Sequence, residues 1–313
     1  MTTHHTIQVD GLDIFYRETG APGLPKLLLL HGFPSSSHQY RNLLTRLAAR
    51  FHMVCVDYPG FGNSAMPDPA TWEYTFDRLT DVTEAALTQI GFTGKMGLYM
   101  QDYGGPIGNR LINRHPDWLQ WQVIQNANSY EEGFTQVWDG LRHALWGNRT
   151  SETEAPLRAF LEYDTVRAIY TTGHPDQTKI SPDNWNMDLY FLARPNAHRV
   201  QLDLLYDYRK NAALYETWQQ SLRERQPKTI IFWGQGDLFF TPAGGEAYLA
   251  DLPHAELIRL DSGHFALEDC LEEIASGMVR FYDAVVAEPD SAARAPLRRG
   301  SHLDSPTSSS RST

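Results

Sequence analysis

The feature that most constrains the fold is an alternation of short apolar runs with longer amphipathic segments, which continues to about residue 125. Buried strands are predicted at 26–30, 53–56, 96–100 and 121–125. Helical spacing of apolar residues marks the segments 39–50, 76–90 and 106–113. This alternation predicts a parallel sheet covered by helices. At the start of the chain, residues 6–16 predict two antiparallel strands that turn at Asp10-Gly11.

The alternation stops near residue 129. The residues from there to 226 are rich in tyrosine and tryptophan and predict a mostly helical insertion after about the sixth strand. Strands resume at 229–233 and 256–260, and a long helix is predicted from Ala266 to about Val285. The last segment is rich in Ser, Pro, Ala and Arg and predicts a disordered tail. The expected organisation is a core in two parts, an inserted cap and a tail, at 1–128 with 227–287, 129–226 and 288–313.

Composition disfavours several classes of partner. The 313 residues carry a net charge of −11, with the acidic residues scattered rather than gathered in a tail. An acidic surface argues against nucleic acid and anionic membranes as partners. Residues 1–10 lack the apolar core of a secretion signal, and no apolar run has the length of a membrane span. We therefore predict a cytoplasmic monomer or homodimer that acts on a small molecule.

The sequence predicts neither a metal nor an organic cofactor. Cys55 and Cys270 lack CxxC spacing, so they are expected to be small buried hydrophobic residues. No group of His and Asp residues has the spacing of metal ligands. Gly60-Phe61-Gly62 predicts a tight turn rather than a phosphate loop, since no matching helix and lysine follow it.

One aspartate stands where a nucleophile is expected. In Met100-Gln101-Asp102-Tyr103-Gly104-Gly105, a strand runs into an acidic residue, which is followed by two glycines and a helix. This is the arrangement of a turn that lifts a nucleophile above a sheet, beside the N–H groups of a helix N-terminus. Taken alone, an aspartate at this place is more often a helix N-cap. Three further segments favour the catalytic interpretation.

Each of these segments also follows a predicted strand, which is where open α/β sheets bind ligands. His31-Gly32-Phe33-Pro34 follows the third strand and predicts that the N–H groups of Phe33 and Tyr103 form an oxyanion hole. Asp237, in Trp233–Asp237, can orient a histidine. His264, in Ser262–Phe265, can act as the base. The chain order of nucleophile, acid and histidine is the one that this fold requires.

With these motifs the chain resembles the α/β-hydrolase superfamily, and within it the branch of epoxide hydrolases and haloalkane dehalogenases. The resemblance covers about residues 6–286 and includes Asp57-Tyr58-Pro59-Gly60-Phe61-Gly62-Asn63-Ser64. It implies a mostly parallel eight-stranded sheet with helices on both faces and a helical cap. Met100 departs from the glycine of serine-type members, but dehalogenase-like members commonly carry an apolar residue there.

An aspartate nucleophile changes the class of substrate. A carboxylate that attacks an ester gives an anhydride and gains nothing, whereas on an sp³ carbon it displaces a leaving group and forms an alkyl ester. His264 then activates a water that attacks the carbonyl carbon of Asp102. We predict hydrolysis of an epoxide to a vicinal diol on a small, largely apolar substrate. A haloalkane dehalogenase is the alternative.

The leaving group decides between these two reactions. Dehalogenases resemble one another in placing a tryptophan directly after the nucleophile, where this chain has Tyr103. An epoxide oxygen needs an acid, which epoxide hydrolases supply from cap tyrosines with a pKa of about 10. The stretch from Tyr206 to Asn211 resembles the cap segment that carries this acid, so Tyr208 is predicted, with Tyr170 as a second donor. Trp185 is predicted to bind substrate with Phe33 and Tyr103, while a cap tryptophan keeps halide binding open, at Trp138, Trp146, Trp185 or Trp218.

Other functions fit the sequence less well. A serine-type esterase lacks its serine at the turn. Fluoroacetate-type dehalogenases resemble this chain in His31-Gly32-Phe33-Pro34, but they place arginines where this chain has Tyr103 and Pro106. A ligand receptor without catalysis is a rival of another class. Such receptors usually lose a member of the triad, and this chain keeps all three.

Overall fold

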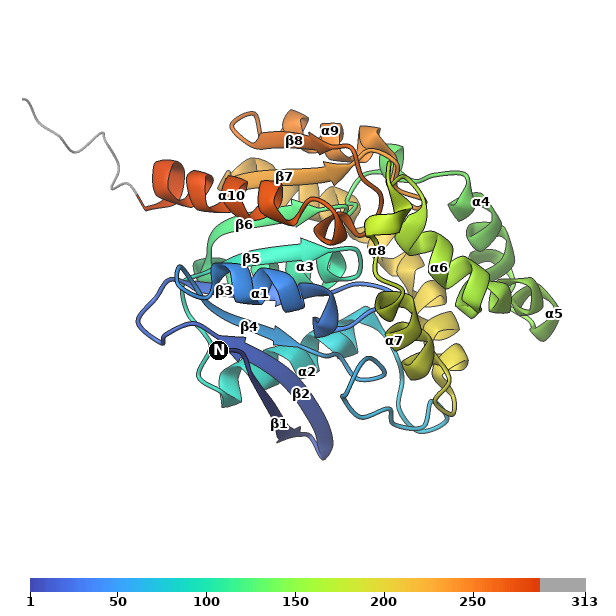
Figure 1. Cartoon of the computed structure of the whole chain (residues 1–313). Helices are drawn as coiled ribbons and strands as arrows, with labels where there is room; N and C mark the ends of the chain where they lie inside the picture. Colours follow the sequence, from blue (N-terminus) through green and yellow to red (C-terminus); the bar gives the residue numbers. More distant parts are fainter. Residues whose placement is uncertain (288–313) are drawn as a thin grey trace, which may run out of the picture.

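The computed structural model describes residues 1–287, which form one eight-stranded sheet in the order β1-β2-β4-β3-β5-β6-β7-β8 (Figure 1). The strands are β1 Thr3–Val9, β2 Leu12–Thr19, β3 Lys26–Leu30, β4 His52–Val56, β5 Met96–Gln101, β6 Leu119–Gln125, β7 Lys228–Gly234 and β8 Glu256–Leu260. The pairs β1–β2 and β2–β4 are antiparallel, and all the other neighbours are parallel. The predicted mostly parallel sheet is therefore confirmed.

The first hairpin follows from two residues. Asp10 and Gly11 both adopt positive φ angles, of 51° and 79°. An Asp-Gly pair favours this kind of two-residue turn, whose twist matches that of the flanking strands. The hairpin is longer than the predicted 6–16, because pairing continues to Thr3 and Glu18.

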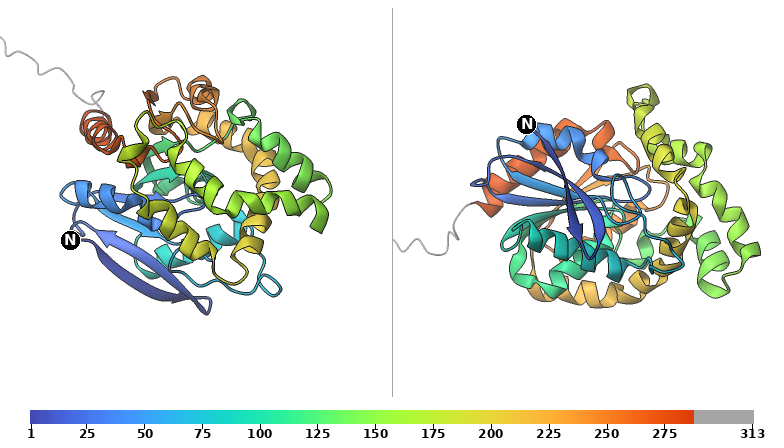
Figure 2. Two further views of the ribbon diagram at one scale, coloured as in Figure 1. Left: turned by 45° about the vertical axis from the view of Figure 1, so that its right-hand side comes forward. Right: turned by 90° about the horizontal axis from the view of Figure 1, so that it is seen from below.

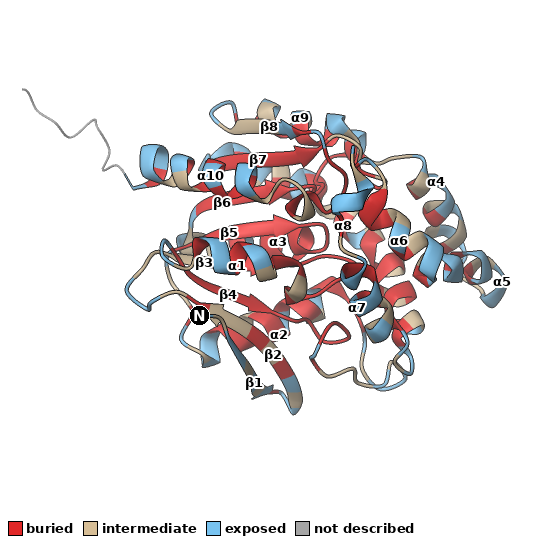
Figure 3. Cartoon of the chain, viewed as in Figure 1, coloured by how far each residue is buried: buried red, intermediate tan, exposed pale blue. Residues whose placement is uncertain are grey.

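Helices cover both faces of the sheet. They are η1 Ser37–Tyr40, α1 Arg41–Leu47, α2 Phe76–Gln89, α3 Gly104–Arg114, η2 Pro116–Trp118, α9 Pro242–Asp251, η7 Ala266–Glu268, α10 Leu271–Phe281 and η8 Tyr282–Val286. Because successive side chains of a strand point to opposite faces, Leu28 and Leu30 of β3 enter the core under α2 and α3. Leu27 and Leu29 enter the other core, under α1 and α10. The inner strands β3 to β7 are accordingly buried along most of their length, whereas the edge strands β1 and β8 are not (Figure 3).

Two predicted helices differ from the structure. The segment predicted at 39–50 begins as the 3₁₀ turn η1 and ends at Leu47. The long helix predicted from Ala266 to about Val285 is interrupted between η7 and α10. At this break the Asp269 carboxylate accepts a hydrogen bond from the Ser262 hydroxyl and pairs with His174. Contacts between distant segments therefore override the local helical pattern.

The helices between β6 and β7 form the insertion, residues 129–226. Its elements are η3 Glu131–Gly133, α4 Val137–Leu141, η4 Arg142–Gly147, α5 Ser151–Glu154, η5 Ala155–Leu161, α6 Tyr163–Thr171, η6 Gln177–Lys179, α7 Asp183–Leu192 and α8 Ala197–Arg225. They lie beyond the carboxyl ends of the parallel strands (Figures 1 and 2). The long helix α8 returns along the core and contacts α2, α3 and α9.

Other expectations concern the tail, the cysteines and membrane spans. The predicted disordered tail, 288–313, lies outside the described residues. Cys55 is buried in β4, as predicted, whereas Cys270 is only partly buried, and both are free thiols. Among the helices of residues 1–287, none combines the length and the apolar character needed to cross a membrane.

Candidate active site

Asp102 occupies a tight turn between β5 and α3. Its φ angle is +48°, in the left-handed region that a non-glycine residue rarely adopts. The turn depends on Gly104, because a Cβ atom there would lie 2.1 Å from the carbonyl oxygen of Leu30. The strained turn raises the Asp102 side chain above the end of β5, as the sequence predicts for a nucleophile.

The Asp102 carboxylate is almost fully buried, with 3% of the residue exposed. Burial raises the pKa of this carboxyl to about 6, and nearby His264 acts in the opposite direction. The backbone N–H groups of Phe33 and Tyr103 also lower it. The Phe33 N–H donates to Asp102 Oδ1 at 2.7 Å. The two N–H groups predicted as an oxyanion hole therefore face the side chain of Asp102 itself.

His264 and Asp237 form a buried pair beside this carboxylate. His264 Nδ1 lies 2.9 Å from Asp237 Oδ2, and His264 Nε2 lies 3.9 Å from Asp102 Oδ2. Burial lowers the pKa of His264, but Asp237 overcompensates, so the pKa is raised overall. With its Nδ1–H donated to Asp237, neutral His264 carries its lone pair on Nε2, which lies 3.9 Å from Asp102 Oδ2 and 3.0 Å from the Gln101 amide nitrogen. The structure thus brings together the three residues predicted from distant segments.

Asn126 supports this arrangement and was missed in the sequence. Its amide Nδ2 donates to Asp237 Oδ2 at 2.8 Å and to the Gly234 carbonyl at 3.1 Å, and its Oδ1 accepts from the Gly234 N–H. The other oxygen of Asp237 accepts the Phe239 N–H at 2.7 Å. These donors hold the Asp237 carboxylate in place beside His264. Asn126 directly follows β6, so its position at the carboxyl edge of the sheet could have identified it as a site residue from the sequence.

Two glutamines hold His264 from the strand ends. Gln101 Nε2 lies 3.0 Å from His264 Nε2, and Gln125 Nε2 donates to the His264 carbonyl at 3.2 Å. Both glutamines are the last residues of their strands, β5 and β6. They restrict both the ring and the backbone of His264. Single glutamines in apolar runs gave no hint of this in the sequence.

The segment 172–174 of the insertion lies between the loops that carry Asp237 and His264. A Cβ atom on Gly173 would lie 2.3 Å from the carbonyl oxygen of Gly236, so the two backbones are in direct contact. On the other side, the Thr172 carbonyl oxygen lies against Gly263, beside His264. The insertion is therefore packed into the triad loops as well as above them.

A small cavity lies against Asp102. Its volume is ≈ 10 Å³, which is about the space that one water molecule needs. Core and insertion both line it, with Phe33, Asp102, Tyr103, Trp138, Leu141, Phe160, Leu205 and Phe239. Apart from Asp102, this lining is apolar or aromatic. Phe33 and Tyr103 therefore lie where the sequence predicts substrate contacts.

The structure does not place the predicted cap residues at this cavity. Within the described chain, Tyr208, Tyr170 and Trp185 are not among the residues that line it. The Tyr208 hydroxyl lies 3.4 Å from that of Tyr215. The Tyr170 hydroxyl donates to Asp188 at 2.6 Å, and the Trp185 ring packs 6.4 Å from the Tyr170 ring. Their assignment as ring-opening acids stays a prediction, and in this structure both hydroxyls have other partners.

The nearby tryptophans are also engaged. Trp138 lines the cavity, but its indole N–H donates to the Phe239 carbonyl at 3.1 Å. The Trp146 N–H donates to the Leu205 carbonyl at 3.0 Å. Neither indole N–H is therefore free to bind a leaving halide in this structure.

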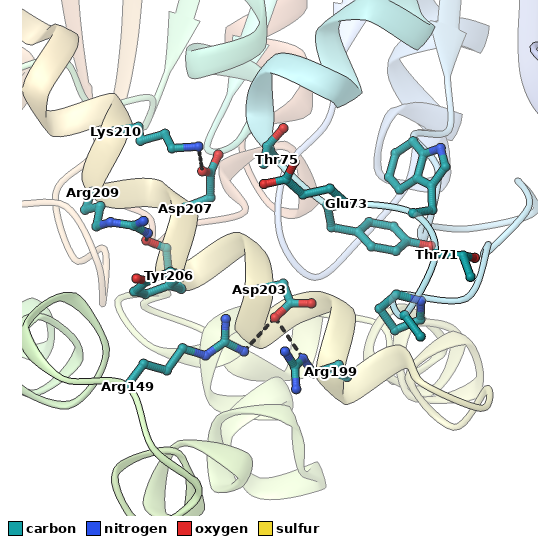
Figure 4. A pocket seen from close by; sticks show the side chains of 14 residues that line it. Thr71, Glu73, Thr75, Arg149, Arg199, Asp203, Tyr206, Asp207, Arg209 and Lys210 are labelled. Carbon is teal, nitrogen blue, oxygen red and sulfur yellow. Dashed lines mark hydrogen bonds and ion pairs between the residues drawn. The ribbon is translucent and has the colours of Figure 1, made fainter.

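A larger hollow lies between residues 69–75 and α8, with a volume of ≈ 400 Å³ (Figure 4). Several of its charged side chains pair with one another. Asp203 accepts from Arg149 at 2.6 Å and from Arg199 at 2.9 Å, while Lys210 lies 2.8 Å from Asp207. Within the described chain this hollow contains no member of the triad, so it is not the candidate active site.

In residues 1–287, no group of three or more His, Cys, Asp or Glu side chains is arranged to hold a metal ion.

Known proteins share both the sequence and the fold. Residues 25–270 match the model of the alpha/beta hydrolase fold family. The chain is 36% identical to an uncharacterized hydrolase of Saccharomyces cerevisiae, YNR064C, over 89% of this chain and 96% of that protein. A haloalkane dehalogenase of Bradyrhizobium diazoefficiens is 26% identical, over 88% of this chain and 93% of the enzyme.

Two solved structures share the fold at low sequence identity. Haloalkane dehalogenase DbeA from Bradyrhizobium elkani has a TM-score of 0.73 at 22% identity, covering 91% of this chain and 100% of its own. Epoxide hydrolase CorEH has a TM-score of 0.72 at 19% identity, covering 90% and 99%. The chain belongs to the α/β-hydrolase-fold family, and the proteins that it is similar to include haloalkane dehalogenases and an epoxide hydrolase.

Proposed function

We propose that the protein hydrolyses a small, largely apolar epoxide to a vicinal diol, through an ester on Asp102. The observation that carries this proposal is the environment of the carboxylate. Its Oδ1 is held by the Phe33 N–H, whereas its Oδ2 faces His264 across 3.9 Å. Oδ1 is placed to become the carbonyl oxygen of an ester and Oδ2 to act as the nucleophile.

In the first step, Asp102 Oδ2 attacks an epoxide carbon. The C–O bond of the ring breaks, and the released oxygen takes a proton to become a hydroxyl group. In the second step, His264 removes a proton from a water molecule, and the water oxygen attacks Cγ of Asp102. The N–H groups of Phe33 and Tyr103 stabilise the oxyanion that forms on Oδ1. Collapse of this intermediate releases the diol and restores Asp102.

The insertion serves in this proposal as a cap. Trp138, Leu141, Phe160 and Leu205 come from it and close the cavity over Asp102. A lining of this kind favours an apolar substrate and excludes water that would compete for the carboxylate. The cap would span the predicted residues 129–226, between core segments 1–128 and 227–287.

The alternative is haloalkane dehalogenation, which the similarity to the Bradyrhizobium diazoefficiens enzyme favours. A halide needs N–H donors, and the indole N–H groups of Trp138 and Trp146 are donated to backbone carbonyls. This observation supports an oxygen leaving group over a halide. A receptor without catalysis is disfavoured by the complete triad geometry.

Trapping the ester tests the proposal. In His264→Gln the first step proceeds and hydrolysis stalls, so the variant is exposed separately to styrene oxide and to 1-bromobutane, and the intact protein is weighed. We expect an adduct with the mass of the epoxide. The control is the double variant His264→Gln, Asp102→Asn, which should form none. An adduct from the bromide alone would make the protein a dehalogenase, and no adduct from either would argue against a carboxylate nucleophile.

A further inference from the structure

The proposed reaction leaves open which group donates to the oxygen of the opening ring. Of the eight residues that line the cavity, two have a side chain with a hydrogen to donate, Tyr103 and Trp138. The Trp138 N–H is donated to the Phe239 carbonyl. The Tyr103 hydroxyl therefore remains as the available donor.

The Tyr103 hydroxyl is buried and has no hydrogen-bond partner within residues 1–287. Burying a polar group without a partner is unfavourable, so such a group calls for an explanation. A substrate oxygen in the cavity would supply the missing acceptor. Asp102 adjoins Tyr103 in the chain and also lines the cavity, so nucleophile and donor would reach the same small molecule.

The ring of Tyr103 is held in place by other aromatic rings. Its centroid lies 4.9 Å from that of Phe76, edge to face, and 5.8 Å from that of Phe33. The residue is only 2% exposed. A donor fixed in this way loses little conformational freedom when it binds the oxygen. Burial, and secondarily Asp102, hold the pKa of the phenol well above its usual value, so it keeps its proton at neutral pH.

We propose that Tyr103 is the catalytic residue that donates to the epoxide oxygen as the ring opens. This assignment rests on the proposed epoxide hydrolysis and replaces Tyr208 and Tyr170 in that role. As Asp102 Oδ2 bonds to carbon and the ring C–O bond breaks, the phenol proton passes to the released oxygen. Hydrolysis of the ester then yields Asp102 as its acid, and that proton restores the phenol.

The test measures the first step alone. In the His264→Gln background, the rate at which styrene oxide adds to the protein is followed by mass spectrometry in a single turnover. Adding Tyr103→Phe should slow this rate by about 100-fold or more, the usual contribution of a general acid. The slowed reaction should also lose the solvent deuterium isotope effect, which a merely structural role would not remove.

Tyr58 provides a matched control. Its hydroxyl is also buried without a partner in the described part of the chain, and its ring stacks on His31 at 4.0 Å. It is not among the described residues that line the cavity. Tyr58→Phe should therefore leave the alkylation rate within about threefold, since it removes no catalytic proton. Thermal unfolding of each variant checks that the fold is kept.

Three outcomes would overturn the assignment. One is an alkylation rate in Tyr103→Phe equal to that in Tyr58→Phe. Another is a large loss in Tyr208→Phe together with none in Tyr103→Phe, which would restore Tyr208 as the acid. If His264→Gln with an intact Tyr103 forms an adduct with styrene oxide, either of these results contradicts the assignment of Tyr103 but leaves the proposed epoxide hydrolysis standing. Absence of any epoxide adduct in that variant would overturn the proposed function together with it.

Discussion

Two histidine–aspartate pairs lie close together in this protein, and only the first of them faces Asp102, the proposed nucleophile. His264 Nδ1 lies 2.9 Å from Asp237, and His174 Nδ1 lies 2.7 Å from Asp269. The Nε2 atom of His264 faces Asp102 at 3.9 Å. The Nε2 atom of His174 has no hydrogen-bond partner in the described residues and lies against Gly263.

The comparison shows that an acid–histidine pair is not by itself a catalytic device. The group that Nε2 of the histidine faces decides the role of the pair. The His174 pair joins the insertion to the loop of His264, because Asp269 also accepts from Ser262 at 2.7 Å. One pair is placed for chemistry, and the other holds the loop that carries it.

Replacing the histidine of each pair should give the largest difference in turnover between the two pairs. His264→Gln removes the base of the second step, so turnover of styrene oxide to diol should fall by up to about 10⁴-fold. His174→Gln leaves the triad in place and should retain most of the turnover. Steady-state diol formation measures both. Equal losses in the two variants would contradict the division of roles.

Exchanging the acids should give the next largest difference. In Asp237→Asn the support for the reactive tautomer of His264 is lost, and turnover should fall by at least about 100-fold. Asp269→Asn should act mainly on stability, because the Ser262 hydroxyl and the His174 ring lose a charged acceptor. Steady-state rates and chemical unfolding curves of both variants distinguish the two effects. A turnover loss in Asp269→Asn as large as that in Asp237→Asn would show that the second pair is catalytic.

Asp269, which pairs with His174, and Asp102, which faces His264, should affect the stability of the fold with opposite signs. The Asp269 pKa is lowered, since the hydrogen bonds of His174 and Ser262 outweigh burial, so its carboxylate adds stability that is lost as the pH falls. The Asp102 pKa is raised from 3.8 to about 6, so the folded state resists its ionisation.

At pH 8, Asp102→Asn should therefore raise the free energy of unfolding, by on the order of 3 kcal/mol at most. Asp269→Asn should lower it by about 1–3 kcal/mol. The gain in Asp102→Asn should be largely lost at pH 4, where the carboxyl is protonated in the folded state and partly protonated in the unfolded state. Denaturant unfolding at pH 8 and pH 4 checks both signs. A loss of stability in Asp102→Asn at pH 8 would contradict the raised pKa.

The smallest expected difference between the two pairs concerns the pH at which the alkylation rate is half of its maximum. Attack needs ionised Asp102, so the alkylation rate of His264→Gln should fall tenfold for each pH unit below the Asp102 pKa. In this variant that pKa lies above about 6, because His264 no longer lowers it. Adding His174→Gln should leave the midpoint unchanged, because His174 faces Asp269 rather than Asp102. Single-turnover rates between pH 4.5 and 8 measure the midpoint. A rate that stays constant over this range would mean that Asp102 is not the titrating nucleophile.

Much of the fold could be predicted because its strands are continuous apolar runs. The strands predicted at 26–30 and 256–260 have these bounds in the structure. Asp102, Asp237 and His264 could be found because each follows a strand, and parallel strands bring their carboxyl ends together. The tyrosines of the insertion could not be assigned in this way. The direction of a hydroxyl on a helix depends on its packing partners, such as Tyr215 for Tyr208 and Asp188 for Tyr170.

The position of residues 172–174 limits how a substrate can enter. Rotation of the whole insertion away from the core would pull Gly173 off Gly236 and Thr172 off Gly263, and so would displace the loops of both Asp237 and His264. We expect this part of the insertion to act as a fixed anchor. The entrance would then open at its other end, where Trp138 and Phe160 close the cavity. Residues at the entrance would then move while Asp102, Asp237 and His264 stay in place. Substrate binding and catalysis could therefore be altered by separate sets of residues.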